Sequence, residues 1–254
     1  MRPEVPSGVA SGRRGPLTPR QSDGGRLLSP AMTEPAHLRA IRAAYDTVAA
    51  DYATLLRTEL DTKPLDRAML AAFAELVRAD DVGPVADLGC GPGRVTAHLH
   101  GLGVPAFGID LSPEMVAVAR RSHPELRFEE GSMTALDLAD GALGGIVAWY
   151  SIIHTPPELL PDVFAEFHRV LAPGGRLLLA FKAGNEHRHL ARAYGHDLSL
   201  DVHWLAPDHV AGLADKAGLT ADARLIREPD ERERPTQGRQ AYLLAHRRGE
   251  VGRS

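Results

Sequence analysis

The sequence predicts an α/β protein whose mostly parallel, doubly wound sheet is covered by helices on both faces. From residue 85 onward, short continuous apolar runs alternate with segments of helical periodicity. Such runs are typical of parallel strands that are buried on both faces. Near the carboxyl terminus, the charged segment Glu228–Gly238 joins the last two apolar runs. It is too short for a helical crossover, so the last strand is expected to be antiparallel.

Two amphipathic helices are expected before the first strand. Apolar residues recur at three- and four-residue steps from Leu38 to Leu55, which predicts one helix with at most one break. The same spacing recurs from Leu65 to Val77, and a turn at Asp81–Pro84 ends the second helix. These helices would bury one face each.

The remaining elements alternate along the chain. The expected strands are Val85–Leu88, Ala106–Ile109, Leu126–Glu129, Gly145–Tyr150, Arg176–Phe181, Leu219–Ile226 and Gln240–Ala245. The expected helices are Val95–Leu102, Pro113–Arg121, Pro157–Leu171 and Pro207–Ala217. Ser112 can cap the second of these, with proline at its first position. A turn is expected at Ala172–Gly175.

The first 31 residues differ in composition from the rest of the chain. They hold five Gly, five Pro and four Ser, with no aromatic residue, and cannot bury enough apolar surface to offset their ordering entropy. Their five Arg leave a targeting peptide or a nucleic-acid arm as other interpretations. Met32 is a second candidate start of translation beside Met1. The expected parts are a disordered leader at 1–31, a single domain at 32–248 with a polar, His-rich insertion at 183–206, and a flexible tail at 249–254.

Composition excludes several classes of protein. The chain is 44% apolar and 24% charged, which is ordinary for a globular domain. Its net charge of −4 argues against broad capture of phosphate backbones, so we expect no nucleic-acid partner. The single cysteine, Cys90, allows no intrachain disulfide, and no apolar run approaches the roughly 18 residues that span a bilayer. We therefore expect a cytoplasmic protein without a membrane partner, as a monomer or a homodimer.

The most specific local signal is a glycine-rich loop between a buried strand and a helix. Val85–Gly93 reads Val-Ala-Asp-Leu-Gly-Cys-Gly-Pro-Gly, and Asp110 ends the next strand. Glycines permit positive-φ turns and let a ligand approach the backbone. Ligands of open α/β sheets bind at the carboxyl ends of strands, where an acid can hold both hydroxyls of a ribose. This pair of features predicts a cofactor of the adenosine type.

The glycine spacing distinguishes between two such cofactors. A pyrophosphate-binding loop reads G-x-G-x-x-G, whereas this one reads G-x-G-x-G with Asp87 two residues before the first glycine. Asp87 would repel a pyrophosphate but suits a cationic group, such as the amino group of a methionine moiety. The loop therefore favours S-adenosylmethionine over NAD.

At this point the sequence resembles the class I S-adenosylmethionine-dependent methyltransferases of the small-molecule type. Asp87–Gly93 is similar to their first motif and Gly108–Met115 to their second. Leu171–Leu177 resembles the turn before their fifth strand, and Tyr45–Tyr52 resembles the amino-terminal segment that covers the cofactor. The resemblance implies a Rossmann-like, seven-stranded sheet with an antiparallel last strand. No metal is implied.

The resemblance also implies roles for individual residues. The cofactor-binding residues that it indicates are Asp87, Gly89, Cys90, Gly91, Gly93, Asp110, Leu111, Ser132, Met133, Trp149 and Tyr52. Family members commonly carry an acid where Ser132 stands, and a serine hydroxyl accepts a hydrogen bond more weakly than a carboxylate. Asp137 is an alternative partner for the adenine amino group.

Acceptor-side residues are expected after the fourth strand, on the amino-terminal helix and in the insertion. His154 is a candidate general base, with capping of the helix near Pro157 as the competing interpretation. Arg188 and Arg192 are expected four apart on a helix face, where they meet an anionic acceptor, pair with Glu186 or lie in water. The expected acceptor contacts are Tyr45, Tyr150, Arg188 and Tyr194.

The predicted function is methyl transfer from S-adenosylmethionine to a small-molecule acceptor. The alternatives are an NAD-dependent oxidoreductase, which the glycine spacing disfavours, and a non-catalytic S-adenosylmethionine-binding protein. An RNA methyltransferase is also disfavoured, because outside the leader there is no basic stripe interleaved with aromatic residues. An Asn-Pro-Pro-Tyr signature is also missing, and Tyr150–Ile153 occupies its place.

Overall fold

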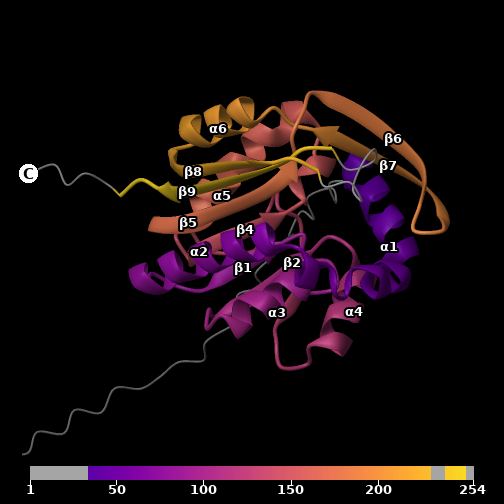
Figure 1. The fold of residues 1–254 in the computed structure, drawn as a ribbon, viewed down its shortest axis with the longest axis horizontal. Helices are drawn as coiled ribbons and strands as arrows, with labels where there is room; N and C mark the ends of the chain where they lie inside the picture. The colour runs from indigo at the N-terminus through magenta and orange to yellow at the C-terminus, as the bar shows by residue number, and fades with distance from the viewer. Residues whose placement is uncertain (1–33, 230–237, 250–254) are drawn as a thin grey trace, which may run out of the picture. The chain divides into compact units, whose positions relative to one another are not determined.

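A computed structural model describes residues 34–229 and 238–249 of the chain. The leader expected at 1–31, most of the charged turn expected at Glu228–Gly238 and nearly all of the tail expected at 249–254 lie outside these residues. The described part contains one seven-stranded sheet and one separate two-stranded sheet (Figure 1).

The large sheet confirms the predicted fold class. Its strands are β1 (Val85–Leu88), β2 (Ala106–Asp110), β3 (Phe128–Glu130), β4 (Leu143–Trp149), β5 (Leu171–Lys182), β8 (Leu219–Arg227) and β9 (Gln240–Arg247). They lie in the order β3-β2-β1-β4-β5-β9-β8. Strands β1 to β5 pair in parallel, and β9 runs antiparallel to both β5 and β8. The predicted antiparallel last strand is therefore confirmed.

Helices cover both faces of this sheet. The helices are α1 (Ala36–Leu56), α2 (Pro64–Asp80), α3 (Arg94–Gly101), α4 (Pro113–Ser122), α5 (Leu160–Val170) and α6 (Pro207–Lys216). On one face, Phe164 and Phe167 of α5 and Val210 of α6 are fully buried against the strands. On the other, Phe73 of α2 and Leu99 of α3 are fully buried. Figure 1 shows α3 and α4 on one side and α6 on the opposite side.

The strand order places a crevice beside β1. The chain moves outward from β1 to β2 and β3, then returns to the other side of β1 for β4. The loops that leave the carboxyl ends of β1 and β4 therefore diverge, and this reversal is where doubly wound folds bind ligands. The glycine loop follows β1 at this point.

Some predicted boundaries differ from the structure. Helix α1 is continuous, without the allowed break. Strand β5 begins at Leu171 and runs through the expected turn, because its pairing with β4 shifts register there. The helix expected from Pro157 starts with a 3₁₀ turn, and α5 begins at Leu160.

The helix expected around Arg188 and Arg192 is wrong. Residues 186–204 form a hairpin of β6 (Glu186–Ala193) and β7 (His196–Trp204). The sequence signal for it is the alternation from Leu198 to Trp204, in which every second residue is apolar. Those apolar side chains turn inward, and Leu200, Val202 and Trp204 are buried.

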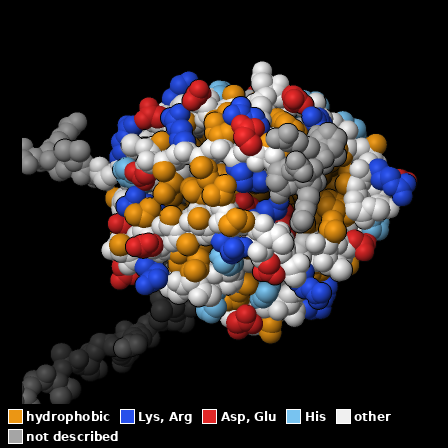
Figure 2. Space-filling model, in the orientation of Figure 1, with side chains coloured by type: hydrophobic (Ala, Val, Ile, Leu, Met, Phe, Trp, Pro, Cys, Tyr) orange, Lys and Arg blue, Asp and Glu red, His pale blue; other side chains and the backbone are white. Residues whose placement is uncertain are grey.

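The hairpin lies beside α1 rather than within the large sheet. In Figure 1 it extends from the end of β5 toward α1, and β7 packs against that helix. Figure 2 shows acidic and basic side chains interspersed with apolar ones on the visible face. Within residues 34–229 and 238–249, no helix combines the length and apolar composition of a membrane span.

Candidate active site

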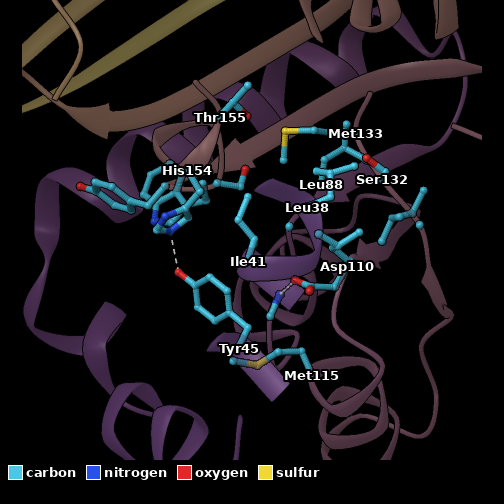
Figure 3. A pocket seen from close by; sticks show the side chains of 18 of the residues that line it. Leu38, Ile41, Tyr45, Leu88, Asp110, Met115, Ser132, Met133, His154 and Thr155 are labelled. Carbon is cyan, nitrogen blue, oxygen red and sulfur yellow. Dashed lines mark hydrogen bonds between the residues drawn. The ribbon is translucent and has the colours of Figure 1, made fainter. Parts of the chain in front are cut away.

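A cavity opens at the carboxyl ends of β1, β2 and β4. Helix α1 covers it, and Figure 3 shows Asp110 and His154 on opposite sides of it. The predicted residues that line it are Tyr45, Tyr52, Gly89, Gly91, Asp110, Leu111, Ser132, Met133, Trp149, Tyr150 and His154. The structure thus brings together eleven of the predicted site residues, which come from five separate parts of the chain.

The glycine loop has the conformation that its sequence predicts. Gly89 and Gly91 adopt φ values of +72° and +54°, which L side chains rarely adopt. A Cβ atom at Gly89 would lie 2.4 Å from the Cβ of Ser151, where the chain leaves β4. Glycine is therefore required at this point for two independent reasons, conformation and close approach.

Asp110 joins the end of β2 to the glycine loop. Its Oδ2 accepts a hydrogen bond from the Gly91 amide at 2.7 Å, and its Oδ1 accepts one from the Ser112 amide at 2.9 Å. Burial raises the pKa of Asp110 to about 6, although these two bonds favour the charged form. Each carboxylate oxygen retains acceptor capacity, so Asp110 can also hold two ligand hydroxyls.

Three of the predicted cofactor-binding residues do not line the cavity, although two of them belong to the glycine loop. Asp87 is fully buried, and its Oδ2 accepts a hydrogen bond from the Thr96 hydroxyl at 2.7 Å. Burial raises the pKa of Asp87 to about 7, and neighbouring Asp110 adds to the rise. Cys90 is buried against Gly108, and Gly93 packs against the ring of Phe128.

The segment after β3 forms the far wall of the cavity. The Ser132 hydroxyl lies 2.8 Å from that of Thr134, so the two share a hydrogen bond and both line the cavity. Asp137, the alternative acid, is exposed and is not among the lining residues. Thr134, which no sequence pattern singled out, thus pairs with Ser132 at the position where family members commonly carry an acid.

The polar groups of this cavity suit a ligand with hydroxyls and a positive charge. Among its described lining residues, Asp110 carries the one carboxylate, and there is no Lys or Arg. Trp149 Nε1 and Ser151 Oγ are buried without a partner among the described residues. Buried donors and acceptors normally have partners, so these two atoms are available to a ligand.

Contacts at three points hold α1 over the cavity. Asp46 accepts a hydrogen bond from the Ser112 hydroxyl at 2.5 Å, and the same hydroxyl caps α4. Nearer the carboxyl end of α1, Asp51 lies 2.7 Å from Nε2 of His196 in the hairpin. Tyr45, next to Asp46 in the sequence, reaches His154, as the dashed line in Figure 3 shows.

A second cavity adjoins the first. Four side chains line both: Tyr45, Tyr52, Tyr150 and His154. Edge-to-face ring contacts connect Tyr194, Tyr52, Tyr45 and His154, with centroids 5.0, 5.9 and 5.3 Å apart in turn. This row of rings runs along the shared wall.

Hydrogen bonds to both ring nitrogens fix the His154 tautomer. Nδ1 lies 2.9 Å from the main-chain carbonyl of Asp201 in β7, so Nδ1 carries the proton and donates. Nε2 then holds a lone pair and accepts from the Tyr45 hydroxyl at 2.6 Å. Burial lowers the pKa of His154 to about 4, so the ring is neutral at pH 7. The ring does not cap the following helix, whose 3₁₀ turn has no side-chain cap.

Tyr150 adopts a left-handed conformation, with φ of +59°, where the chain leaves β4. Its hydroxyl lies 3.4 Å from that of Tyr242, which donates to Asp66 at 2.6 Å. Strained backbone of this kind persists where the surroundings hold it and is frequent at functional sites. No local pattern singles out Tyr242 and Asp66, because they come from β9 and α2, far from Tyr150 in the sequence.

The hairpin contributes less to the site than its polar composition suggested. Arg188 lies outside both cavities, where its guanidinium is 2.8 Å from Glu186 and lies over the ring of Trp204. His187 and His189 both contact the carboxylate of Asp201 on an exposed surface. Within the described residues, no group of three or more His, Cys, Asp or Glu could hold a metal ion.

Of the two acceptor contacts expected in the hairpin, Arg188 and Tyr194, only Tyr194 lines a cavity. With φ values of +53° and +86°, Tyr194 and Gly195 form its two-residue turn, a position that favours Asn or Gly. The turn places the Tyr194 ring against Tyr52, where it lines the second cavity.

Comparison with known proteins relates this geometry to a family. A family model described as a methyltransferase domain matches residues 85–175. The chain is 32% identical over 140 residues to the demethylmenaquinone methyltransferase of Chlorobaculum parvum, covering 53% of this chain and 56% of the relative. It is 31% identical over 110 residues to the malonyl-(acyl-carrier protein) O-methyltransferase of Pectobacterium atrosepticum, covering 43% of each. The chain thus spans about half the length of these relatives or less.

The fold agrees with a solved methyltransferase over a longer stretch. The magnesium protoporphyrin IX methyltransferase of Synechocystis PCC 6803, solved with bound S-adenosylmethionine, has a TM-score of 0.61 at 15% identity. That alignment covers 86% of this chain and 100% of the solved one, which establishes a shared fold. The glycine loop and Asp110 lie within the residues that the family model matches, and S-adenosylmethionine is the cofactor that they imply. Residues 85–175 thus match a methyltransferase domain, and the chain is similar in sequence to the two methyltransferases above and in fold to the solved one.

Proposed function

We propose that this protein transfers a methyl group from S-adenosylmethionine to a small-molecule acceptor bound in the second cavity. The observation that carries this proposal is the wall of four side chains that the two cavities share. A cofactor in the first cavity and an acceptor in the second would meet at this wall. Holding two reactants in contact can lower the barrier to transfer by several kcal/mol.

The residues of the first cavity fit S-adenosylmethionine. Asp110 would accept from both ribose hydroxyls, and Leu111 and Met133 would pack against the adenine. Ser132 would contact the adenine edge, and Tyr52 and Trp149 would flank the methionine side. Gly89 and Gly91 let the ligand approach the backbone, while Asp87, Cys90 and Gly93 stabilise the loop through buried contacts. The single lining carboxylate and the lack of Lys or Arg among these residues favour a cation.

When bound, S-adenosylmethionine supplies a methyl group on a sulfonium sulfur that leaves as a neutral thioether. The acceptor's nucleophilic atom provides the electron pair for the new bond to carbon. An acceptor hydroxyl or ammonium must also lose a proton. Tyr45 and His154 offer a route for it: the acceptor proton moves to the Tyr45 oxygen as the Tyr45 proton moves to Nε2 of His154.

The hairpin would cover the acceptor. Leu190, Leu200 and Val202 line the second cavity from β6 and β7, and Tyr194 lines it from the turn. The relatives named for demethylmenaquinone and for malonyl-(acyl-carrier protein) act on very different molecules, so acceptor choice follows the second cavity rather than the shared sheet. This assigns the insertion at 183–206 to acceptor selection.

The test is the release of S-adenosylhomocysteine from S-adenosylmethionine across a library of small-molecule acceptors. We expect release with at least one acceptor. Leu200→Trp fills the second cavity and should abolish that turnover while cofactor affinity remains. Asp162→Ala on α5, an exposed position, is the control and should change neither. Tight cofactor binding without release from any acceptor would instead support a binding protein without catalysis.

A further inference from the structure

Two phenols, Tyr45 and Tyr150, line both cavities. A phenol oxygen carries one proton to donate and lone pairs that accept, so the direction of its proton decides which ligand groups it can bind. The Tyr45 proton is directed at Nε2 of His154, 2.6 Å away (Figure 3). The Tyr45 oxygen therefore offers only its lone pairs to a molecule in the cavity.

Hydrogen bonds behind Tyr150 direct its proton away from the cavities in the same way. The Tyr242 hydroxyl donates its single proton to Oδ1 of Asp66 at 2.6 Å, and its oxygen accepts from Nε of Arg227 at 3.3 Å. Tyr242 has no second proton to donate, so Tyr150 is the donor in the hydrogen bond of 3.4 Å between the two hydroxyls. The Tyr150 oxygen, like that of Tyr45, keeps lone pairs for a ligand.

These two phenols accept hydrogen bonds from a ligand and donate none, so they select hydrogen-bond donors. A carbonyl or ether oxygen placed against either phenol would bring lone pairs against lone pairs and would lose its hydrogen bonds to water without replacement. An O–H or N–H group would instead satisfy the phenol that it contacts. The pair is therefore matched by a molecule with two donor groups, one for Tyr45 and one for Tyr150.

The charged side chains of the second cavity already have partners within the protein. Arg94 lies 2.9 Å from Glu59, and Asp66 accepts from Tyr242. The other cations that line the cavity also have interactions of their own: Lys63, Lys182 and Arg227. An acceptor therefore needs no charge to complement this lining.

Apolar side chains form most of the remaining lining of the second cavity. They come from α1, from the turn after β4 and from the hairpin: Leu55, Leu56, Ile153, Leu190, Leu200 and Val202. Burying apolar surface of a ligand against them is favourable. An uncharged acceptor with an apolar body fits this lining.

The low basicity of His154 restricts the kind of hydroxyl that can react. Burial lowers the pKa of this ring to about 4, which makes it a weak base. A phenol, with a pKa of about 10 like that of tyrosine, loses its proton to such a base far more easily than an aliphatic alcohol does. The reacting group at Tyr45 is therefore better matched by a phenol than by an alcohol.

We propose that the acceptor is an uncharged aromatic diol, and that the Tyr150 oxygen accepts a hydrogen bond from the hydroxyl that is not methylated. This inference rests on the proposed methyltransferase function. The other hydroxyl reacts at Tyr45: its oxygen uses an electron pair to bond to the methyl carbon, whose bond to the sulfonium sulfur breaks and leaves a neutral thioether. Its proton passes to Tyr45 as the Tyr45 proton passes to His154.

The experiment compares diols with phenols that lack one of the two hydroxyls. The diols are 4-hexylcatechol, 4-hexylresorcinol and hexylhydroquinone, which differ in the spacing of their hydroxyls, and the phenols are the three isomeric hexylphenols. Binding to the protein saturated with S-adenosylhomocysteine is measured by titration under nitrogen. The wild type should bind at least one diol about five- to tenfold more tightly than its matched phenols, the usual value of one hydrogen bond.

Tyr150→Phe keeps the ring and removes the accepting oxygen. It should lower the affinity of the preferred diol to that of the phenols, while the affinity of the phenols stays within about twofold and shows that the site is folded. Ser122→Ala removes an exposed hydroxyl at the end of α4 and should leave the diol preference unchanged. In turnover, Tyr150→Phe should raise KM for the diol about five- to tenfold with kcat within about twofold.

Several results would overturn this assignment. They are equal affinities for diols and phenols in the wild type, a diol preference that survives in Tyr150→Phe, tighter binding of the diols' monomethyl ethers than of the diols, and no binding of any of these compounds at millimolar concentration. A fall in kcat of Tyr150→Phe with unchanged KM would also overturn it, because Tyr150 would then act in proton transfer.

Failure of this inference is distinguishable from failure of the proposed function. Release of S-adenosylhomocysteine with a hexylphenol or another acceptor, without any preference for diols, would overturn the inference and leave the methyltransferase function intact. If the wild type does not bind S-adenosylhomocysteine at all, the methyltransferase function fails, and the inference fails with it.

Discussion

The Tyr45 hydroxyl lies 2.6 Å from Nε2 of His154 and donates to it, where the two cavities meet. The carbonyl of Asp201 holds the opposite ring nitrogen, so the lone pair of the imidazole faces Tyr45 and not the open cavity. An acceptor therefore meets the phenol first. In the proposed mechanism, Tyr45 therefore connects the base to the acceptor.

The pH dependence of turnover should reflect the low pKa of His154. A base works only when unprotonated, and burial holds this pKa at about 4. With the cofactor saturating, so that ionisation of Asp110 does not limit cofactor binding, kcat/KM for a hydroxyl acceptor should be flat between pH 6 and 8 and fall as the pH drops toward 4. A limb near pH 6.5, the ordinary histidine value, would show that the ring is not buried as described.

Substitutions of the pair should lower turnover without affecting the cofactor. His154→Gln should reduce kcat by about 10²–10⁴, the usual contribution of a positioned base. Tyr45→Phe keeps the ring contacts but removes the hydroxyl, and should lower kcat by a similar factor. Cofactor affinity, measured by titration, should change little in either. Full activity of Tyr45→Phe would mean that the acceptor reaches His154 directly.

Asp87→Asn should stabilise the protein at neutral pH. The folded pKa of about 7 lies above the ordinary value of 3.8. The stability that this group contributes is therefore complete below pH 4 and is lost as the pH rises to 7. The amide carries no charge to bury, so the advantage of the variant should grow by roughly 1–3 kcal/mol between pH 5 and 7. Urea unfolding across this range measures the free energy of unfolding of both proteins. A difference between them that does not change with pH would refute the raised pKa.

Gly89→Ala should abolish cofactor binding through a clash that a control can isolate. The new methyl would lie 2.4 Å from the Cβ of Ser151, in addition to the strain of a positive φ. Gly174→Ala carries a similar φ of +81° but meets nothing within 4 Å. Both should lose about 1–2 kcal/mol from the backbone. Only Gly89→Ala should also lose cofactor affinity, and equal affinities in titration would contradict the close approach.

Tyr194→Asn separates backbone strain from acceptor contact. Asparagine tolerates the left-handed turn, which favours the variant by about 1 kcal/mol, while the lost ring contact with Tyr52 costs a similar amount. The melting temperature should therefore change little. KM for the acceptor should rise, because the ring lines the second cavity. An unchanged KM would remove Tyr194 from the acceptor site.

Local sequence signals predicted the sheet, and the structure brings most of the expected cofactor-binding residues together around one cavity. The apolar runs of the strands, the glycine loop and Asp110 are recognised from residues close to them in the sequence. Spacing alone therefore locates them. The hairpin was missed because its insertion was interpreted from the polar residues and not from the alternation of Leu198 to Trp204. The partners of His154 come from α1 and β7, and no local pattern in the sequence predicts that they meet.

The most direct test of this account is titration of the protein with S-adenosylhomocysteine, beside Asp110→Ala and Asp137→Ala. The wild type should bind one equivalent and should not bind NAD. Asp110→Ala removes the acceptor of the ribose hydroxyls and of the Gly91 amide, and should weaken binding by about 10- to 150-fold. Asp137→Ala, an exposed acid outside the cavity, should bind as the wild type does. No binding by the wild type, or an unchanged dissociation constant in Asp110→Ala, would contradict the assignment of the cavity to S-adenosylmethionine.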